Sequence, residues 1–134
     1  MKHKILVVDD EPEIRKTIRL QLEGTIFEIL EAEDGETGIQ TLDNENILEV
    51  EVIICDVRMP KVNGIEAVAY FRANYASIPI IVLTGYPDVH LAVDFLKSGV
   101  IDYLVKPVEK KKLVEAIHKA ARQKTLFSGA QPKM

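Results

Sequence analysis

The stretch Val52-Ile53-Ile54-Cys55-Asp56 is a short apolar run that ends at a carboxylate. Consecutive β-branched residues without polar alternation are typical of a strand that is buried on both faces, and such strands favour a parallel sheet covered by helices. Asp56 then lies at the carboxyl end of this strand. In open α/β sheets, ligands bind in the crevice beyond the carboxyl ends of the strands. The stretch therefore predicts a fold class and places one carboxylate where chemistry is expected.

Similar strand patterns recur along the chain and alternate with helical ones. Besides 52–56, the predicted strands are Lys4–Val8, Phe27–Ala32, Pro79–Thr84 and Val100–Val105. The predicted helices are Pro12–Leu22, Gly35–Leu42, Ile65–Tyr75, Val89–Leu96 and Val108–Lys124. This alternation predicts a three-layer α/β sandwich, a five-stranded parallel sheet with right-handed crossovers and five helices. The second strand carries glutamates, so we expect it at an edge of the sheet.

Length and composition set further limits. The chain has 134 residues, a formal net charge of -4 and 47% hydrophobic residues, as expected for one globular domain. We assign residues 3–124 to this domain and 125–134 to a flexible tail or the start of a linker. No apolar run is long enough to span a membrane, and no secretory signal is evident, so we expect a cytoplasmic protein. The negative charge argues against direct nucleic-acid binding, and the single cysteine, Cys55, excludes an internal disulfide.

Polar side chains follow the predicted strands at the points where the strands end. Asp9 and Asp10 follow the first strand, Asp56 the third, Thr84 the fourth and Lys106 the fifth. In a parallel sheet these ends share one edge, so we expect the carboxylates, the hydroxyl and the ammonium to face a common crevice. Singly, each has an ordinary structural interpretation, as a helix cap, a turn residue or a solvated charge. Their joint occurrence at the strand ends favours a functional site.

The chemistry available to this set is restricted. Neighbouring carboxylates repel one another, so either one of them binds a proton or a cation neutralises them. Mg2+ suits such a set, because it binds one or two carboxylates together with water and phosphate oxygens. With the metal bound, Asp56 could attack phosphorus as a nucleophile while Mg2+ and Lys106 offset the charge of the equatorial oxygens. Thr84 could then donate its hydroxyl to a phosphoryl oxygen, and this hydrogen bond would move the loop that carries it.

These residues resemble the receiver domain of a two-component response regulator. That family has an acidic pair after the first strand, a phosphoacceptor aspartate shortly before Met-Pro, a Thr or Ser after the fourth strand and Lys-Pro after the fifth. The corresponding residues, in the same order, are Asp9-Asp10, Asp56-Val57-Arg58-Met59-Pro60, Thr84-Gly85 and Lys106-Pro107. The resemblance covers residues 3–124 and implies the flavodoxin-like strand order 2-1-3-4-5 found in chemotaxis regulators.

The resemblance also implies roles for single residues. A sensor histidine kinase or a phosphotransfer protein would pass a phosphoryl group to Asp56, and the domain would be a signalling switch that catalyses only its own phosphorylation and dephosphorylation. Asp10, Asp56 and the backbone carbonyl of Arg58 would hold Mg2+, and Asp9 would act mainly through the waters of the metal. Tyr103 matches the aromatic position that turns inward when the threonine after the fourth strand shifts.

In this family the switch changes the surface formed by the fourth helix, the fifth strand and the fifth helix, which contacts an output domain or a partner protein. For the fourth helix we expect an inward stripe of Val89, Ala92, Val93 and Leu96. Leu91 and Phe95 lie off that stripe, so they and Tyr103 are our candidates for the apolar part of the output surface. The sequence identifies no particular partner and leaves a phosphorylation-dependent dimer open.

Two large side chains are expected to control the lifetime of the phosphorylated state. In the family, the residue two positions after the acceptor and the residue two positions after the threonine flank the path of the hydrolysing water. These residues are Arg58 and Tyr86. Their bulk predicts slower loss of the phosphoryl group than small residues would give.

Other functional classes fit the residues less well. A phosphatase of the haloacid dehalogenase type requires a second aspartate two residues after the nucleophile, where this chain has Arg58. A flavodoxin-like FMN carrier requires a phosphate-binding loop after the first strand, where Asp9-Asp10-Glu11 would repel the phosphate. A receiver-like module that docks without phosphorylation is a further alternative, and the complete set of site residues argues against it. Whether the chain acts alone or is the receiver of a longer regulator stays open.

Overall fold

The computed structural model describes residues 3–59 and 61–127, with side chains described up to residue 124. Its sheet contains five parallel strands in the order β2-β1-β3-β4-β5. The strands are β1 His3–Val8, β2 Phe27–Ala32, β3 Val50–Cys55, β4 Ile80–Thr84 and β5 Asp102–Val105. The predicted fold class and strand order are therefore confirmed, and β2 lies at an edge of the sheet as expected.

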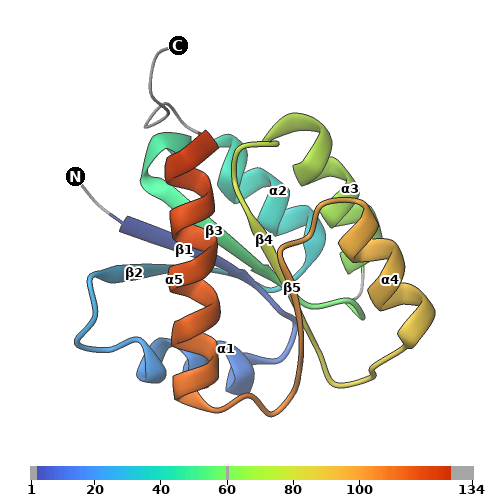
Figure 1. The fold of residues 1–134 in the computed structure, drawn as a ribbon, viewed down its shortest axis with the longest axis horizontal. Helices are drawn as coiled ribbons and strands as arrows, with labels where there is room; N and C mark the ends of the chain where they lie inside the picture. The colour runs from blue at the N-terminus through green and yellow to red at the C-terminus, as the bar shows by residue number, and fades with distance from the viewer. Residues whose placement is uncertain (1–2, 60, 128–134) are drawn as a thin grey trace.

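Helices connect the strands along the described part of the chain (Figure 1). They are α1 Pro12–Gln21, α2 Gly35–Asp43, α3 Gly64–Asn74, α4 Val89–Lys97 and α5 Lys110–Phe127. A short 3-10 helix that the sequence pattern did not predict, η1 Ile47–Glu49, precedes β3. Residues 125–127, assigned above to a flexible tail, belong to α5, and the rest of that tail lies outside the described residues. Pro60 of the Met-Pro pair also lies outside them.

Short polar side chains begin several of the helices. Asp34, Asn63 and Asp88 accept hydrogen bonds at 2.7, 3.0 and 3.0 Å from backbone N–H groups in the first turns of α2, α3 and α4. Such caps satisfy donors that a helix start leaves unpaired. Pro12 occupies the start of α1, where its missing N–H costs nothing. The helix starts therefore follow from local sequence signals.

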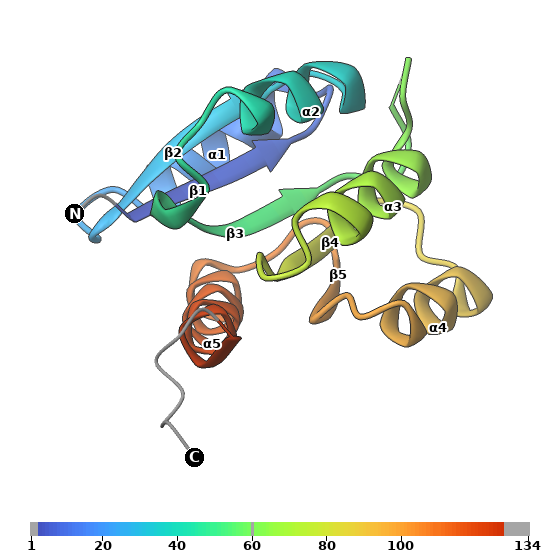
Figure 2. The same ribbon diagram turned by 90° about the horizontal axis from the view of Figure 1, so that it is seen from above.

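Each face of the sheet packs against its own set of helices (Figure 2). On one face, α2, α3 and α4 cover a core that includes Leu6, Val8, Leu42, Ile53, Phe71 and Phe95. On the other face, α1 and α5 cover a core that includes Ile5, Val7, Ile18, Ile54, Leu113 and Ile117. Successive residues of β1 and β3 alternate between the two cores, and both faces are buried. This is why both strands read as unbroken apolar runs.

The inward face of α4 differs from the prediction. Phe95 is 5% exposed and its ring centroid lies 6.3 Å from that of Tyr103, while Leu91 packs against the same core. Of the predicted stripe, Ala92 is half-buried, and the other members are 77%, 43% and 51% exposed: Val89, Val93 and Leu96. Because apolar residues surround this helix, periodicity alone allowed either stripe, and the core buries the larger aromatic side chain. The predicted stripe was therefore wrong, and Phe95 is not available to an output surface.

Candidate functional site

The polar residues at the strand ends meet at one edge of the sheet. Because the strands are parallel, the loops that follow β1, β3, β4 and β5 lie at the same end of the strands. Asp9, Asp56 and Thr84 are almost fully buried there, at 2%, 5% and 1% exposure. Carboxylates are almost never buried unless they are paired. Their burial therefore distinguishes this edge from an ordinary set of surface turns.

Lys106 supplies positive charge to this group. Its ammonium nitrogen lies 2.8 Å from a carboxylate oxygen of Asp9, 2.9 Å from one of Glu11 and 3.5 Å from one of Asp56. Backbone N–H groups complete the pairing, because Glu11 N–H donates to the Asp9 carboxylate and Val57 N–H donates to the Asp56 carboxylate, each at 2.9 Å. The structure thus brings Asp56 and Lys106 together, as the sequence predicted, although they come from different strand ends.

Burial and charge both shift the protonation of this group. Burial, reinforced by the charge of Asp9 and opposed by Lys106, raises the pKa of Asp56 to about 6. Burial also raises the pKa of Asp9, against the hydrogen bond from Lys106. For Lys106, burial alone would lower the pKa, but hydrogen bonds to Asp9 and Glu11 outweigh it, and the pKa is raised. The ammonium group therefore stays charged at neutral pH, and the carboxylates remain short of positive charge.

Four carboxylates are placed to hold a metal ion. One oxygen atom from each of Asp9, Asp10, Glu11 and Asp56 lies within 4.8 Å of the other three. Asp10 and Glu11 are exposed whereas Asp9 and Asp56 are buried, so the cluster opens to solvent on one side. Hard cations such as Mg2+ take oxygen ligands and retain several waters. A half-open cluster of carboxylates therefore fits a divalent cation.

Thr84 lies beside Lys106, at the start of the loop that joins β4 to α4. The backbone N–H of Lys106 donates to the carbonyl oxygen of Thr84 at 2.8 Å, and the backbone N–H of Tyr86 donates to the Thr84 hydroxyl at 3.0 Å. Tyr103 is half-buried, and its hydroxyl oxygen accepts the backbone N–H of Asp88 at 3.2 Å. Both predicted switch residues are thus hydrogen-bonded to the backbone of the same loop.

Arg58 and Tyr86 connect the loops that follow β3 and β4. The guanidinium carbon of Arg58 lies 4.3 Å from the centroid of the Tyr86 ring, which is a cation–π contact. Both side chains are exposed to solvent. The sequence predicted them as two separate bulky residues, whereas the structure shows that they form a pair.

Two residues that the sequence analysis gave no role contribute to this edge. A Cβ atom on Gly64 would lie 2.1 Å from the carbonyl oxygen of Asp56, so only glycine allows α3 to begin this close to the end of β3. Glu11 joins the ion pairs around Lys106. The sequence signal for Gly64 was an Asn-Gly turn, and the signal for Glu11 was its place next to two aspartates. Neither signal indicates these contacts.

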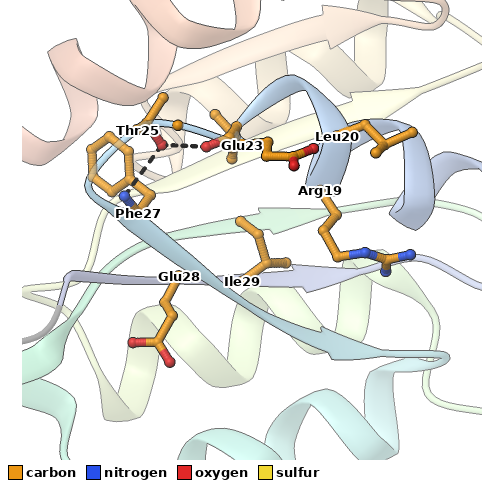
Figure 3. Close-up of a pocket in the computed structure, with 9 residues that line it drawn as sticks. Arg19, Leu20, Glu23, Thr25, Phe27, Glu28 and Ile29 are labelled. Atoms are coloured by element: carbon orange, nitrogen blue, oxygen red, sulfur yellow. Dashed lines mark hydrogen bonds between the residues drawn. The ribbon is translucent and has the colours of Figure 1, made fainter.

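A cavity of about 410 Å³ lies away from this edge, where α1 ends and β2 begins (Figure 3). Thr25 lies in the turn between them, donating its hydroxyl to the carbonyl of Leu22 and accepting the N–H of Phe27. Charged and apolar side chains line the cavity, including Arg19, Leu20, Glu23, Glu28 and Ile29. None of the predicted site residues is among them, so the cavity and the candidate site are separate features.

Comparison with known proteins identifies the family. Residues 5–118 match the response regulator receiver domain. The chain therefore belongs to this family, the signalling domains that receive the signal in two-component systems. The resemblance found in the sequence is confirmed.

Solved structures and curated relatives agree with this assignment. A response regulator receiver domain protein from Clostridium thermocellum has a TM-score of 0.86 and 34% identity, covering 93% of this chain and 98% of that one. The transcriptional regulatory protein FixJ of Bradyrhizobium diazoefficiens is 34% identical over 122 residues, and GlrR of Escherichia coli is 33% identical over 126 residues. These matches cover 91% and 92% of this chain but 58% and 28% of the two regulators. The chain thus spans little more than half of FixJ and less than a third of GlrR.

Among the helices of the described residues, none has the length and apolar character needed to cross a membrane.

Proposed function

We propose that the domain receives a phosphoryl group on Asp56 from the phosphohistidine of a sensor histidine kinase or a phosphotransfer protein. One observation carries this proposal: the buried carboxylate of Asp56 lies 3.5 Å from an ammonium group and within a cluster of carboxylates. The arrangement offers a nucleophile, a positive charge for the incoming oxygens and ligands for a divalent cation. Membership of the receiver family supports the same reaction.

In the proposed step, an ionised oxygen of Asp56 attacks phosphorus in line with the leaving nitrogen. The O–P bond forms as the P–N bond breaks, and the bonding electrons leave with the nitrogen of a ring whose other nitrogen is protonated, which gives neutral imidazole. Lys106 is placed to contact the transferred oxygens, since its ammonium already lies beside Asp56. The product is an acyl phosphate, which water later hydrolyses to aspartate and inorganic phosphate. The domain so catalyses only its own phosphorylation and dephosphorylation.

The proposed metal is Mg2+. Asp10, Asp56 and the backbone carbonyl of Arg58 are its proposed direct ligands, and Asp9 acts through metal-bound water. The close approach of the carboxylate oxygens supports this assignment. When bound, the ion would neutralise charge on the phosphoryl oxygens.

The proposed switch runs through Thr84 and Tyr103. A phosphoryl oxygen on Asp56 would accept a hydrogen bond from the Thr84 hydroxyl and draw Thr84 towards it. Tyr86 and Asp88 would move with it, because their backbone N–H groups are bonded to Thr84 and Tyr103. Movement of this loop would change the position of the Tyr103 ring and hence the surface around it.

The proposed output surface lies on α4, β5 and α5. Its apolar part consists of Leu91 and Tyr103, which are half-buried, and of side chains that are 43–77% exposed: Val89, Val93, Leu96 and Val105. These exposed residues take the place of Phe95, which the core buries. Exposed apolar groups of this kind suit a protein partner. A phosphorylation-dependent dimer through this surface belongs to the same proposal.

The proposed setting is a cytoplasmic signalling pathway. FixJ and GlrR are transcriptional regulators that extend beyond the segments matched here. An output domain joined after residues 3–124, with 125–134 as the start of a linker, is therefore one arrangement. The other is a stand-alone domain that docks on a separate output protein. In both, this domain itself makes no contact with nucleic acid.

The phosphoacceptor assignment is tested with acetyl phosphate as the phosphodonor. Wild type and Asp56→Asn are incubated with acetyl phosphate and Mg2+ and followed by intact-mass spectrometry. Wild type is expected to gain one phosphoryl group and Asp56→Asn none, and omission of Mg2+ is expected to slow the gain. Asp94→Asn, which removes an exposed carboxylate on α4, serves as the matched control and should behave as wild type. Equal labelling of Asp56→Asn would show that the acceptor lies elsewhere.

Arg58 and Tyr86 are proposed to shield the acyl phosphate from water. Replacing both with alanine should speed its decay about two- to five-fold, the size of effect that a cation–π pair supports. Because the side chains touch, each single substitution should produce most of the change. Decay is measured by intact mass after removal of the donor. Unchanged or slower decay in the double variant would contradict the shielding role.

A further inference from the structure

The ammonium group of Lys106 lies closer to the carboxylates of Asp9 and Glu11 than to that of Asp56, the proposed phosphoacceptor. Its ammonium is 2.8 Å from Asp9 and 2.9 Å from Glu11, both within hydrogen-bond distance, but 3.5 Å from Asp56. Asp9 follows β1 and is 2% exposed, so its position is set by the fold. Glu11 is the exposed member of this group, with a side chain that is 58% accessible. The carboxylate of Glu11 is therefore the partner of Lys106 that is free to leave.

The backbone of Glu11 serves helix α1, whereas its side chain contacts Lys106. Glu11 stands at the N-cap of α1, and its backbone carbonyl accepts hydrogen bonds from Ile14 and Arg15. Its N–H donates to the Asp9 carboxylate at 2.9 Å. The side chain makes no capping bond to the helix and reaches Lys106 instead. A cap residue usually satisfies its own helix, so the ion pair with Lys106 is a separate use of this carboxylate.

We propose that Glu11 is a positioning residue that keeps Lys106 at ion-pair distance from Asp56, but not in hydrogen-bond contact with it, in the unphosphorylated domain and releases it when a phosphoryl group arrives. The inference rests on the proposed phosphorylation of Asp56. Two of the three N–H donors of the ammonium group reach Asp9 and Glu11, so a movement of this group towards oxygens on Asp56 stretches at least one of these two contacts. Glu11 is the partner that gives way, because water can solvate its exposed carboxylate, whereas buried Asp9 would be left without a positively charged partner.

The size of the effect follows from the exposure of the pair. Partly exposed ion pairs contribute little to stability. Loss of the Glu11 contact should therefore raise the rate of phosphorylation by acetyl phosphate, and the affinity for beryllofluoride with Mg2+, about two- to five-fold. Beryllofluoride mimics the phosphoryl group, so its affinity reports the release of Lys106 without a chemical step.

Three variants separate this role from a general effect of charge. Glu11→Gln removes the ion pair, and Glu11→Asp keeps the charge on a side chain that is one methylene shorter. Glu13→Gln removes a charge from an exposed residue of the same helix turn, for which no ion pair is found among the described residues. Glu11→Gln and Glu11→Asp should both give the increase, and Glu13→Gln should give none. An increase in Glu13→Gln, or none in Glu11→Asp, would show that net charge at the site is responsible and would overturn the proposal.

The same substitution in a Lys106→Met background gives the decisive test. If Glu11 acts through Lys106, Glu11→Gln has no further effect on rate or affinity once the ammonium group is absent. An equal increase in both backgrounds would overturn the proposal, because Glu11 would then act on the metal or the phosphodonor directly. A wild type that takes no phosphoryl group at all would refute the proposed function. A wild type that is phosphorylated as fast as Glu11→Gln, with equal beryllofluoride affinity, would refute only the role of Glu11.

Discussion

Two lysines whose side chains are largely covered lie at opposite ends of the strands and have different partners. Lys106 follows β5 and faces the carboxylates of Asp9, Glu11 and Asp56. Lys124 is 6% exposed near the end of α5 and reaches the start of β3, where its ammonium donates to backbone carbonyl oxygens. The acceptors belong to Ile47 at 2.7 Å, Leu48 at 3.3 Å, and Val50.

The difference in partners produces a difference in pKa. Burial lowers the pKa of Lys124, and the charge of Glu51 only partly opposes it. At Lys106 the hydrogen bonds to carboxylates outweigh burial, and the pKa is raised. Neutral carbonyls satisfy hydrogen bonds without balancing the charge, whereas carboxylates do both.

The comparison shows why one lysine suits a switch and the other an anchor. The carbonyls around Lys124 are fixed by the backbone, so this side chain ties α5 to the segment before β3 and has nothing to exchange. The carboxylates around Lys106 are side chains, and an anionic phosphoryl group can replace one of them. Three predictions test this contrast.

The largest difference is expected in phosphoryl transfer. Lys106→Met removes a preorganised positive charge beside Asp56 and should slow phosphorylation by acetyl phosphate about 100-fold. Lys124→Met should change the rate less than about two-fold, because Lys124 lies at the opposite end of the strands from Asp56. Time courses of intact mass measure both rates. Comparable slowing in the two variants would mean that loss of fold, not loss of charge, limits the reaction.

The second difference is expected in stability. Lys124→Met leaves buried carbonyl oxygens without their donor and should lower the free energy of unfolding by about 1 to 3 kcal/mol. Urea titration followed by circular dichroism measures the change. Mg2+ should not restore the lost stability, since the site near Asp56 is intact. An unchanged unfolding midpoint would show that water replaces the ammonium group and that Lys124 is not an anchor.

The smallest effect is expected on stability when the charge of Asp56, next to Lys106, is removed. The pKa of Asp56 is raised to about 6, above its ordinary value of 3.8, so the ionised carboxylate destabilises the folded state above that pH. Asp56→Asn should therefore raise the free energy of unfolding by about 1 to 2 kcal/mol near pH 7.5 in metal-free buffer. Wild type gains relative stability as pH falls through about 6, and the difference should vanish below about pH 4.

Chemical denaturation of wild type and Asp56→Asn at several pH values, in buffer that contains a chelator, measures this effect. Asn retains an oxygen that can accept the Val57 N–H, so the comparison isolates the charge. A difference that stays constant from about pH 7.5 to about pH 4 would contradict the raised pKa of Asp56.

Much of the fold could be predicted from local signals. Unbroken apolar runs marked the buried strands, and Pro12 and Asp88 marked helix starts because each satisfies local backbone geometry. The positions of Asp9, Asp56 and Lys106 followed from strand ends in a parallel sheet. The strand order came from the family resemblance, since alternation of strands and helices does not specify which strands pair.

Other features depend on which surfaces meet. The α4 prediction failed because Val93 and Phe95 lie on alternative apolar stripes, and only the space beside Tyr103 selects the aromatic one. Only glycine fits at position 64, at the start of α3, because the Asp56 carbonyl lies so close to it. Neither contact has a signature in the residues around it.

Burial periodicity and chain order are sufficient to assign the strands, the alternation of elements and the set of charged groups at the strand ends. The closer pairing of Lys106 with Glu11 than with Asp56 arises only when the strand ends come together in the folded domain. The contact of Lys124 with backbone carbonyls of a segment distant in the chain likewise arises on folding. A lysine side chain is long and flexible, so its partner is selected by the neighbours that folding brings within reach, and no local pattern contains that information.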